Sequence, residues 1–323
     1  MSDEKAEEIR QELAAAGISS ATSDLDFVPT KVSAAAASCK TNVRVEWNRM
    51  TAANKKSFID AIVCLTKKPS RGVTPTDGTY TPTLWDDLYW THSIQVNGVH
   101  SVDTFLPFHR YFVHVFDKLL RSECGYTAPL PWWRETDAAG KVKSTNLFTS
   151  SYFGTLPART SIAGSCISDG PFKGLKGTFG CVARGENATV TARVTKAREN
   201  ECHGNATTTY RQHRICVEST NHSDMHIGIG PTMADVALSP ADPIFWMHHS
   251  YIDYQWKRWQ NVASSRSTSI EGCYNPGYGS GAPCLALELD HPLGVDGIVP
   301  DMTVGDILNT ENNILCYTYD DLL

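Results

Sequence analysis

Residues 242–260 read DPIFWMHHSYIDYQWKRWQ, and residues 92–112 read HSIQVNGVHSVDTFLPFHRYF. Within both stretches, apolar side chains recur at the three- and four-residue intervals of an amphipathic helix. Asp242 is suited to cap the helix of the first stretch, and Pro243 is suited to its first helical position. Both stretches also carry histidines, so we expect helices that present imidazoles to a core.

Helices are expected through much of the remaining chain. Asp103 or Thr104 can cap the helix that contains Pro107 in its first turn. Apolar periodicity and end signals predict further helices over residues 2–16, 42–66 and 83–95, the last followed by an Asn97-Gly98 turn. For two segments we expect less order, namely irregular structure held by disulfides over 140–217, and loops with short strands over 262–323.

Composition limits the classes of protein that this chain can belong to. The 323 residues are 41% hydrophobic, which is enough for a large core. A net charge of −6 argues against nucleic-acid binding, and no apolar run is long enough to span a membrane.

Cysteine usage predicts an oxidising compartment. The ten cysteines include no C-x-x-C pair, which favours several disulfides over a zinc ribbon or a thioredoxin-like site. Asn187 and Asn205 each begin an N-glycosylation pattern. The acidic N-terminus is no signal peptide, so we expect a secreted protein in its mature form. An intracellular protein with reduced thiols is the alternative.

Seven of the eleven histidines fall in two clusters: His92, His100 and His109, and then His222, His226, His248 and His249. Imidazole is a common ligand of zinc, copper and iron. His222 and His226 share one helix face, but Ser223 replaces the glutamate that a zinc protease requires. Neighbouring residues of a helix lie about 100° apart, so at most one of the adjacent pair His248 and His249 is a ligand. An isolated H-x-x-x-H pair, such as His222 and His226, is more often structural than metal-binding.

The two quoted stretches, with their internal spacing, resemble the two copper-binding signatures of the type 3 copper proteins, which are tyrosinases, catechol oxidases and haemocyanins. The first signature ends in LP-aromatic-HR, and the second has H-x-x-x-H followed by D-P-x-F-x-x-H-H-x-x-x-D-x-x-W. Residues 39–70 also resemble the N-terminal region of short fungal tyrosinase-like enzymes. The sequence YTYD at 317–320 resembles the tyrosine motif that closes the catalytic domain.

The resemblance covers residues 39–320 and implies a mainly α fold with a four-helix-bundle core around two copper ions. We therefore expect one tyrosinase-like catalytic domain over 1–323, with a helical extension at 1–38 and a copper domain at 39–320. We also expect no C-terminal shielding domain of the family after YTYD. The implied copper ligands are His92, His100 and His109 for one ion, and His222, His226 and His249 for the other.

The resemblance selects His249 rather than His248. The haemocyanin branch keeps a single histidine at this place, seven residues after the aspartate of the motif and four before the next. In this chain those offsets fall on His249, between Asp242 and Asp253. Asp253 could then accept a hydrogen bond from the His249 ring and orient it.

The function that the resemblance implies is oxidation of o-diphenols to o-quinones by O2. Glu218 would hold a water near the coppers. Many tyrosinases have Asn at the position of Ser223, so serine favours diphenol oxidation over monophenol hydroxylation. Ile227 suggests an apolar mouth that admits substituted phenols such as o-methoxyphenols. Gly98 stands where many fungal members have a cysteine cross-linked to a ligand, so no thioether can form.

Three alternatives remain open from the sequence: a full tyrosinase, a haemocyanin-type oxygen-binding protein, and a structural protein whose histidines bind zinc or nothing. We expect a phenolic substrate and O2 as partners, no nucleic acid, no membrane, and a monomer or weak homodimer. Asn221 also begins a glycosylation pattern, but its place in the copper signature argues against a glycan there.

Overall fold

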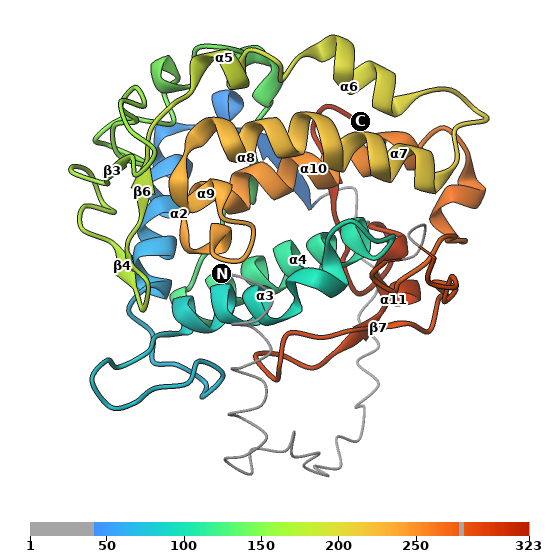
Figure 1. Ribbon diagram of the computed structural model, residues 1–323, viewed down its shortest axis with the longest axis horizontal. Coiled ribbons are helices and arrows are strands. Elements are labelled where there is room, and N and C mark those ends of the chain that lie inside the picture. Colours follow the sequence, from blue (N-terminus) through green and yellow to red (C-terminus); the bar gives the residue numbers. More distant parts are fainter. Residues whose placement is uncertain (1–41, 278–280, 323) are drawn as a thin grey trace. The chain divides into compact units, whose positions relative to one another are not determined.

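The computed structural model describes residues 42–277 and 281–322 (Figure 1). The chain divides into two units, Met1–Ser38 and Cys39–Leu323. The helix predicted over 2–16 and the extension predicted over 1–38 lie outside the described residues. One copper domain over 39–320 stays a prediction.

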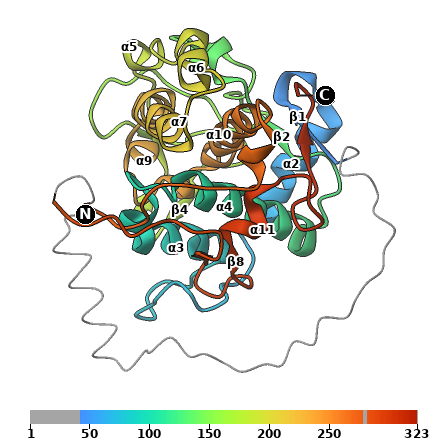
Figure 2. The same cartoon turned by 90° about the vertical axis from the view of Figure 1, so that its right-hand side faces the viewer.

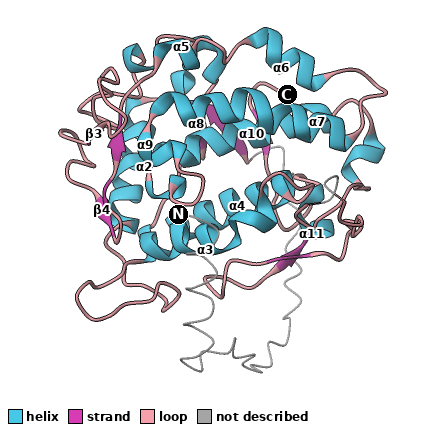
Figure 3. Ribbon diagram, viewed as in Figure 1, coloured by secondary structure: helices cyan, strands magenta, loops and turns pink. Residues whose placement is uncertain are grey.

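The described residues are mainly helical, with a few short strands (Figure 3), which confirms the predicted fold class. Three long helices pass through the core: α3 (Leu84–Val99), α4 (Phe105–Cys124) and α10 (Ile244–Gln260). The fourth helical stretch of the core is continuous, made of α7 (Tyr210–Val217), the π-helix η5 (Glu218–His222) and α8 (Ser223–Ile229). Figures 1 and 2 place α3 and α4 on one side, and α7 and α10 on the other.

Local sequence accounts for the ends of these helices. The Thr83 hydroxyl accepts a hydrogen bond from the Asp86 amide at the start of α3, and the Asp86 carboxylate bonds back to Thr83. Gly125 ends α4 in the left-handed conformation, with φ 66°, which glycine adopts without a steric cost. Nearly every residue of α10 is buried, as expected for a helix that packs on all sides.

Two predicted helix boundaries are wrong. Helix α3 continues to Val99 through the expected Asn97-Gly98 turn, because helical hydrogen bonding outweighs the turn preference of these two residues. At the start of α10, Pro243 rather than Asp242 is the cap residue. The Asp242 carboxylate is instead bound by two guanidinium nitrogens of Arg184, and it also accepts from the Ile244 amide at 3.0 Å.

The helix predicted over 42–66 is also wrong in its first third. The segment begins with strand β1 (Val43–Glu46) and the short helix η2 (Trp47–Arg49), and only then forms α2 (Ala52–Leu65). Strand β1 pairs in parallel with β2 (Pro131–Trp132) and with β9 (Thr318–Tyr319). Both partners are distant in sequence, so periodicity within the segment carries no sign of them.

The segment 140–217 is more regular than the sequence suggested. It contains the end-capped helices α5 (Ala188–Thr191) and α6 (Lys196–His203) as well as α7. The other elements of the described chain are short: η3 (Glu135–Ala138), η4 (Val142–Ser144), β3 (Ser165–Cys166), β4 (Lys176–Gly177), β5 (Gly180–Cys181), β6 (Ala183–Arg184), α9 (Pro231–Ala234), η6 (Ser239–Ala241), η7 (Ser264–Ser267), β7 (Pro292–Leu293), β8 (Met302–Thr303) and α11 (Val304–Leu308).

Disulfides tie the helical core to its loops. Within the described residues there are four: Cys64–Cys124, Cys166–Cys181, Cys202–Cys216 and Cys273–Cys284. The first joins α2 to the end of α4, and the other three close local loops. Among the same residues, no helix is both long and apolar enough to cross a bilayer.

A buried ionic cluster around Asp253 holds α10 against β1, α4 and the YTYD segment. The carboxylate accepts from Arg44 of β1 at 2.9 Å and from Arg110 of α4. It also accepts from the hydroxyls of Tyr317 and Tyr319, the two tyrosines of the YTYD sequence. Although burial opposes ionisation, Arg110 and Arg44 lower the pKa of Asp253, so it stays charged.

Candidate metal centre

The first histidine cluster joins α3 to α4. His92 lies on α3, His100 directly follows its last residue, and His109 lies in the second turn of α4. Ligand atoms of the three rings all lie within 4.8 Å of one another. The Nε2 atoms of His92 and His109 are 3.4 Å apart.

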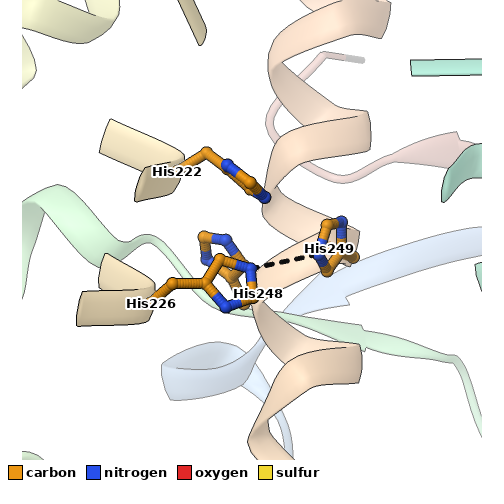
Figure 4. A group of neighbouring side chains, drawn as sticks. All are labelled: His222, His226, His248 and His249. Carbon is orange, nitrogen blue, oxygen red and sulfur yellow. Dashed lines mark hydrogen bonds between the residues drawn. The ribbon is translucent and has the colours of Figure 1, made fainter. Parts of the chain in front are cut away.

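The second cluster joins α8 to α10 (Figure 4). It contains four buried histidines, His222, His226, His248 and His249, whose ligand atoms again lie within 4.8 Å of one another. His222 ends the π-helix η5, and its ring centroid is 4.5 Å from that of His226, one turn later. A π-helical turn is rare and occurs often at functional sites. The Nε2 atoms of His226 and His249 are 3.4 Å apart.

The two clusters adjoin. His109 of the first and His249 of the second stack, with ring centroids 4.3 Å apart and planes at 12°. The Phe245 ring also packs against the His249 ring, with ring centroids 4.1 Å apart. The six imidazoles that were predicted as ligands lie together in this one interior region. The seventh imidazole there belongs to His248.

Backbone carbonyls fix the orientation of five of these rings. Each Nδ1 lies 2.7–3.2 Å from one carbonyl oxygen: Ala237 for His92, Val96 for His100, Phe105 for His109, Glu218 for His222 and Met233 for His226. A carbonyl oxygen only accepts, so each Nδ1 carries the proton and each Nε2 presents a lone pair. This is the arrangement in which second-shell bonds prepare a histidine for a metal.

The distances between Nε2 atoms fit a shared cation. Two imidazole nitrogens that each lie about 2.0–2.1 Å from one tetrahedral ion are separated by roughly 3.4 Å. This is the separation of His92 from His109 and of His226 from His249. Lone pairs that face each other at this distance repel unless a cation lies between them. The buried Nε2 of His222 likewise has no hydrogen-bond partner among the described residues. The donor set therefore fits two metal ions.

Burial keeps the imidazoles neutral and ready to bind metal. It lowers the pKa of five of them well below the usual 6.5, with a further lowering from neighbouring rings: His92, His109, His222, His226 and His249. Burial also lowers the pKa of His100 to about 4 and that of His248 to about 3. At neutral pH none of these rings needs to lose a proton before it binds a metal.

His248 and His249 have different surroundings. His248 Nδ1 is 2.6 Å from Glu135 Oε1, and both side chains are fully buried. The hydrogen bond expected from His249 to Asp253 is wrong, because two arginines and two tyrosines already donate to that carboxylate. Among the described residues, His249 Nδ1 has no hydrogen-bond partner. Stacking on the His109 ring and packing against the Phe245 ring orient His249 instead.

Comparison with known proteins identifies the family. Residues 82–262, more than half of the chain, match the common central domain of tyrosinase. The chain belongs to the tyrosinase family.

Fungal members of the tyrosinase family are among its relatives. Tyrosinase ustQ of Aspergillus flavus is 31% identical over 297 residues, which cover 86% of this chain and 79% of the relative. The N-acetyl-6-hydroxytryptophan oxidase ivoB of Emericella nidulans is 26% identical, over 86% of this chain and 92% of the relative. A solved polyphenol oxidase mutant from Thermothelomyces thermophila has the same fold, with a TM-score of 0.75 at 22% identity over 98% and 95% of the two chains.

As a tyrosinase-family protein, the chain is a copper oxidoreductase, and the family's cofactor is a pair of copper ions. The two histidine clusters supply the imidazoles for that pair. Tyrosinase-like oxidases act on phenolic substrates with O2.

A pocket of about 600 Å³ opens onto the clusters and is lined by His100, His222 and His226. Glu218 and Ser223, the two predicted catalytic residues, also line it. Burial raises the pKa of Glu218, although the Ser101 amide and Arg214 act in the opposite direction. Its Oε1 accepts from Ser101 N at 2.6 Å, and its Oε2 accepts from Arg214 Nη1 at 2.9 Å.

Two residues next to the centre were missed from the sequence. Arg214 precedes Glu218 by four positions on one helical face, so the i,i+4 spacing could have predicted their ion pair. Glu135 lies in a short helix of an irregular segment, far in sequence from His248. No local pattern marks it.

Proposed function

We propose that this protein oxidises o-diphenols to o-quinones with O2. Two o-diphenols and one O2 would give two o-quinones and two waters. One observation carries the proposal: two adjoining groups of neutral, pre-oriented imidazoles lie at the base of a pocket that is open to a phenol. The bound copper pair would supply the two-electron exchange with O2.

We assign the protein residues the following roles. His92, His100 and His109 would hold one copper, and His222, His226 and His249 the other. Glu218 would hold a water beside them and take the phenolic proton, since its carboxylate lines the pocket and burial raises its pKa. We assign His249 rather than His248 to this copper because His249 Nε2 lies 3.4 Å from His226 Nε2 and the His249 ring stacks on His109. His248, bonded to Glu135, would instead hold α10 in place.

Preference for o-diphenols over monophenols follows from Ser223. The residue after His222 borders the pocket, where an asparagine amide could help to orient a bound water or phenol. The shorter serine hydroxyl reaches less far. Ile227, which is 42% exposed, gives the same pocket an apolar edge that suits a substituted ring.

Two features support broader parts of the proposal. The name of the relative N-acetyl-6-hydroxytryptophan oxidase describes a hydroxylated aromatic ring with a large substituent, in line with an open pocket here. Four disulfides support secretion, because thiols of cytosolic proteins are kept reduced.

Oxygen consumption by the copper-loaded protein tests the proposal. Catechol, tyrosine and guaiacol should be compared side by side, with copper-free protein as the control. We expect sustained turnover of catechol and much slower turnover of tyrosine. A single stoichiometric uptake of O2 without turnover would instead indicate an oxygen carrier. Equal rates on catechol and tyrosine would indicate a full tyrosinase.

A further inference from the structure

The mouth of the copper pocket is lined by exposed apolar side chains. Among the described residues, eight large apolar side chains are exposed, and three of them line this one pocket: Ile215, Ile227 and Val236, which are 43%, 42% and 50% exposed. Single apolar residues scattered over a surface are normal, whereas a group of them around a cavity marks a binding site. The group therefore indicates a ligand with an apolar part.

Separate segments of the chain supply the three side chains. Ile215 lies on α7, Ile227 lies on α8, and Val236 comes shortly after α9. Because no single helix carries all three, the group is not the exposed margin of one helix's buried face. Ile227 directly follows His226 in the chain, and both line the pocket, so the apolar group adjoins the metal centre.

The pocket is much larger than one aromatic ring needs. A cavity of about 150 Å³ is enough for benzene, whereas this pocket measures about 600 Å³. Small side chains also line it and leave its walls open: Ser101, Ser219, Ser223, Ala234 and Ser239. A phenol ring that reaches the histidines would therefore leave most of the pocket to a substituent.

Charged side chains of the same pocket define the competing explanation. Arg211, Arg214 and Glu218 line it, and a charged substituent could pair with one of them. Ion pairs that stay in contact with water contribute little to binding, whereas the contribution of apolar contact grows with every methylene that is covered. An apolar substituent also removes water from the isoleucines and the valine, which a charged group does not do. The apolar alternative is therefore the one that the lining favours.

From this arrangement we infer the substrate class, an inference that rests on the proposed function. The protein takes an o-diphenol whose ring bears an uncharged apolar chain of several carbons. The ring lies at the histidines, and the chain lies against Ile215, Ile227 and Val236 and covers them from water.

The length of the chain should have a measurable effect on binding. Full burial of one methylene strengthens binding about fourfold, so a chain that is covered on one side should gain about twofold per methylene. A pentyl group has four more carbons than a methyl group and should therefore bind about fifteenfold more tightly. Methyl and pentyl groups affect the electrons of the ring alike, so the comparison reports on the chain and not on the ease of oxidation.

Paired substrates test the inference on the copper-loaded protein. The kcat/KM for 4-pentylcatechol should exceed that for 4-methylcatechol about fifteenfold. It should also exceed that for 5-(3,4-dihydroxyphenyl)pentanoate, whose chain has a similar length but ends in a carboxylate. A higher kcat/KM for the pentanoate, or equal values for the methyl and pentyl compounds, would overturn the inference.

A matched pair of double variants locates the effect. Ile215→Ser combined with Val236→Ser should lower the pentyl-to-methyl ratio about three- to fivefold, because two of the three apolar contacts are lost. Val262→Ser combined with Ile314→Ser is the control. It changes the same residue types at side chains that are each 41% exposed and lie outside the pocket lining, so it should leave the ratio unchanged.

A binding measurement separates this inference from the proposed function. 4-Methylbenzamide and 4-pentylbenzamide have no ring hydroxyl to oxidise, so calorimetry can compare their affinities whether or not turnover occurs. We expect tighter binding of the pentyl compound, and a smaller preference in the variant with serines at 215 and 236. A pentyl preference that survives this double variant, or that the control variant reduces equally, would overturn the inference. Failure of every diphenol to be oxidised, with the pentyl preference intact, would overturn only the proposed function.

Discussion

His249 and His248 are adjacent and equally buried, yet only His249 should matter for copper content. His249 Nε2 lies 3.4 Å from His226 Nε2, the separation expected for two ligands of one ion. His248 is engaged at Nδ1 by Glu135. We predict that His249→Ala reduces bound copper from two ions to about one per chain, and that His248→Ala leaves it close to two.

The expected loss of affinity is large enough to measure. Four-ligand structural zinc sites bind with about 10–16 kcal/mol, or roughly 3–4 kcal/mol per ligand. Loss of one ligand therefore weakens binding by roughly a hundredfold to a thousandfold. Loss of a residue that only supports a ligand typically costs about 10–100-fold. His248→Ala would also leave the buried Glu135 carboxyl unpaired. It should therefore lower the melting temperature while the copper content stays close to two ions per chain.

Elemental analysis after dialysis against a mild chelator gives the copper content, and circular dichroism shows whether each variant is folded. His92→Ala is the matched control, because loss of a ligand from the other cluster should also leave about one copper. Copper loss in His248→Ala with full copper in His249→Ala would refute the assignment and the distance argument behind it.

Three further predictions concern the surroundings of the centre. Glu218→Gln should keep both coppers but lower kcat/KM for catechol by about a hundredfold, the usual effect of losing a general base; an unchanged rate would remove its role as proton acceptor. Asp253→Asn should destabilise the fold by about 3–5 kcal/mol, because the buried Arg44 and Arg110 would lose their counter-charge; chemical denaturation measures this, and a change below 1 kcal/mol would contradict it. Burial lowers the pKa of His213 to about 3, so the folded protein binds its proton less readily than the unfolded chain, whose histidine pKa is about 6.5. Stability should therefore be full above pH 6.5 and fall as the pH drops toward 3, and His213→Gln should flatten this slope in denaturation curves, whereas an identical slope would show that His213 titrates normally.

The helices that carry most of the metal ligands could be predicted because their signals are local. The apolar stripe around His109 predicted α4, and the dense apolar pattern around His249 predicted α10. His222 and His226 were expected on one face, and their rings do meet. The resemblance of the two stretches to the copper signatures of type 3 copper proteins then implied which rings gather.

Features that depend on distant segments could not be predicted. Strand β1 forms because Pro131–Trp132 and Thr318–Tyr319 come alongside it, and nothing within Val43–Glu46 indicates those partners. Asp253 was assigned to His249 from the i+4 spacing alone. Its partners Arg44 and Arg110 lie more than 140 residues away, and charged donors compete better for a carboxylate than a neutral ring does.

Diffraction from copper-loaded crystals at the copper absorption edge tests the central claim most directly. We predict two anomalous peaks about 3.5–4 Å apart, one bound by His92, His100 and His109, and the other by His222, His226 and His249. A single peak, or a second peak bound by His248 in place of His249, would contradict this account.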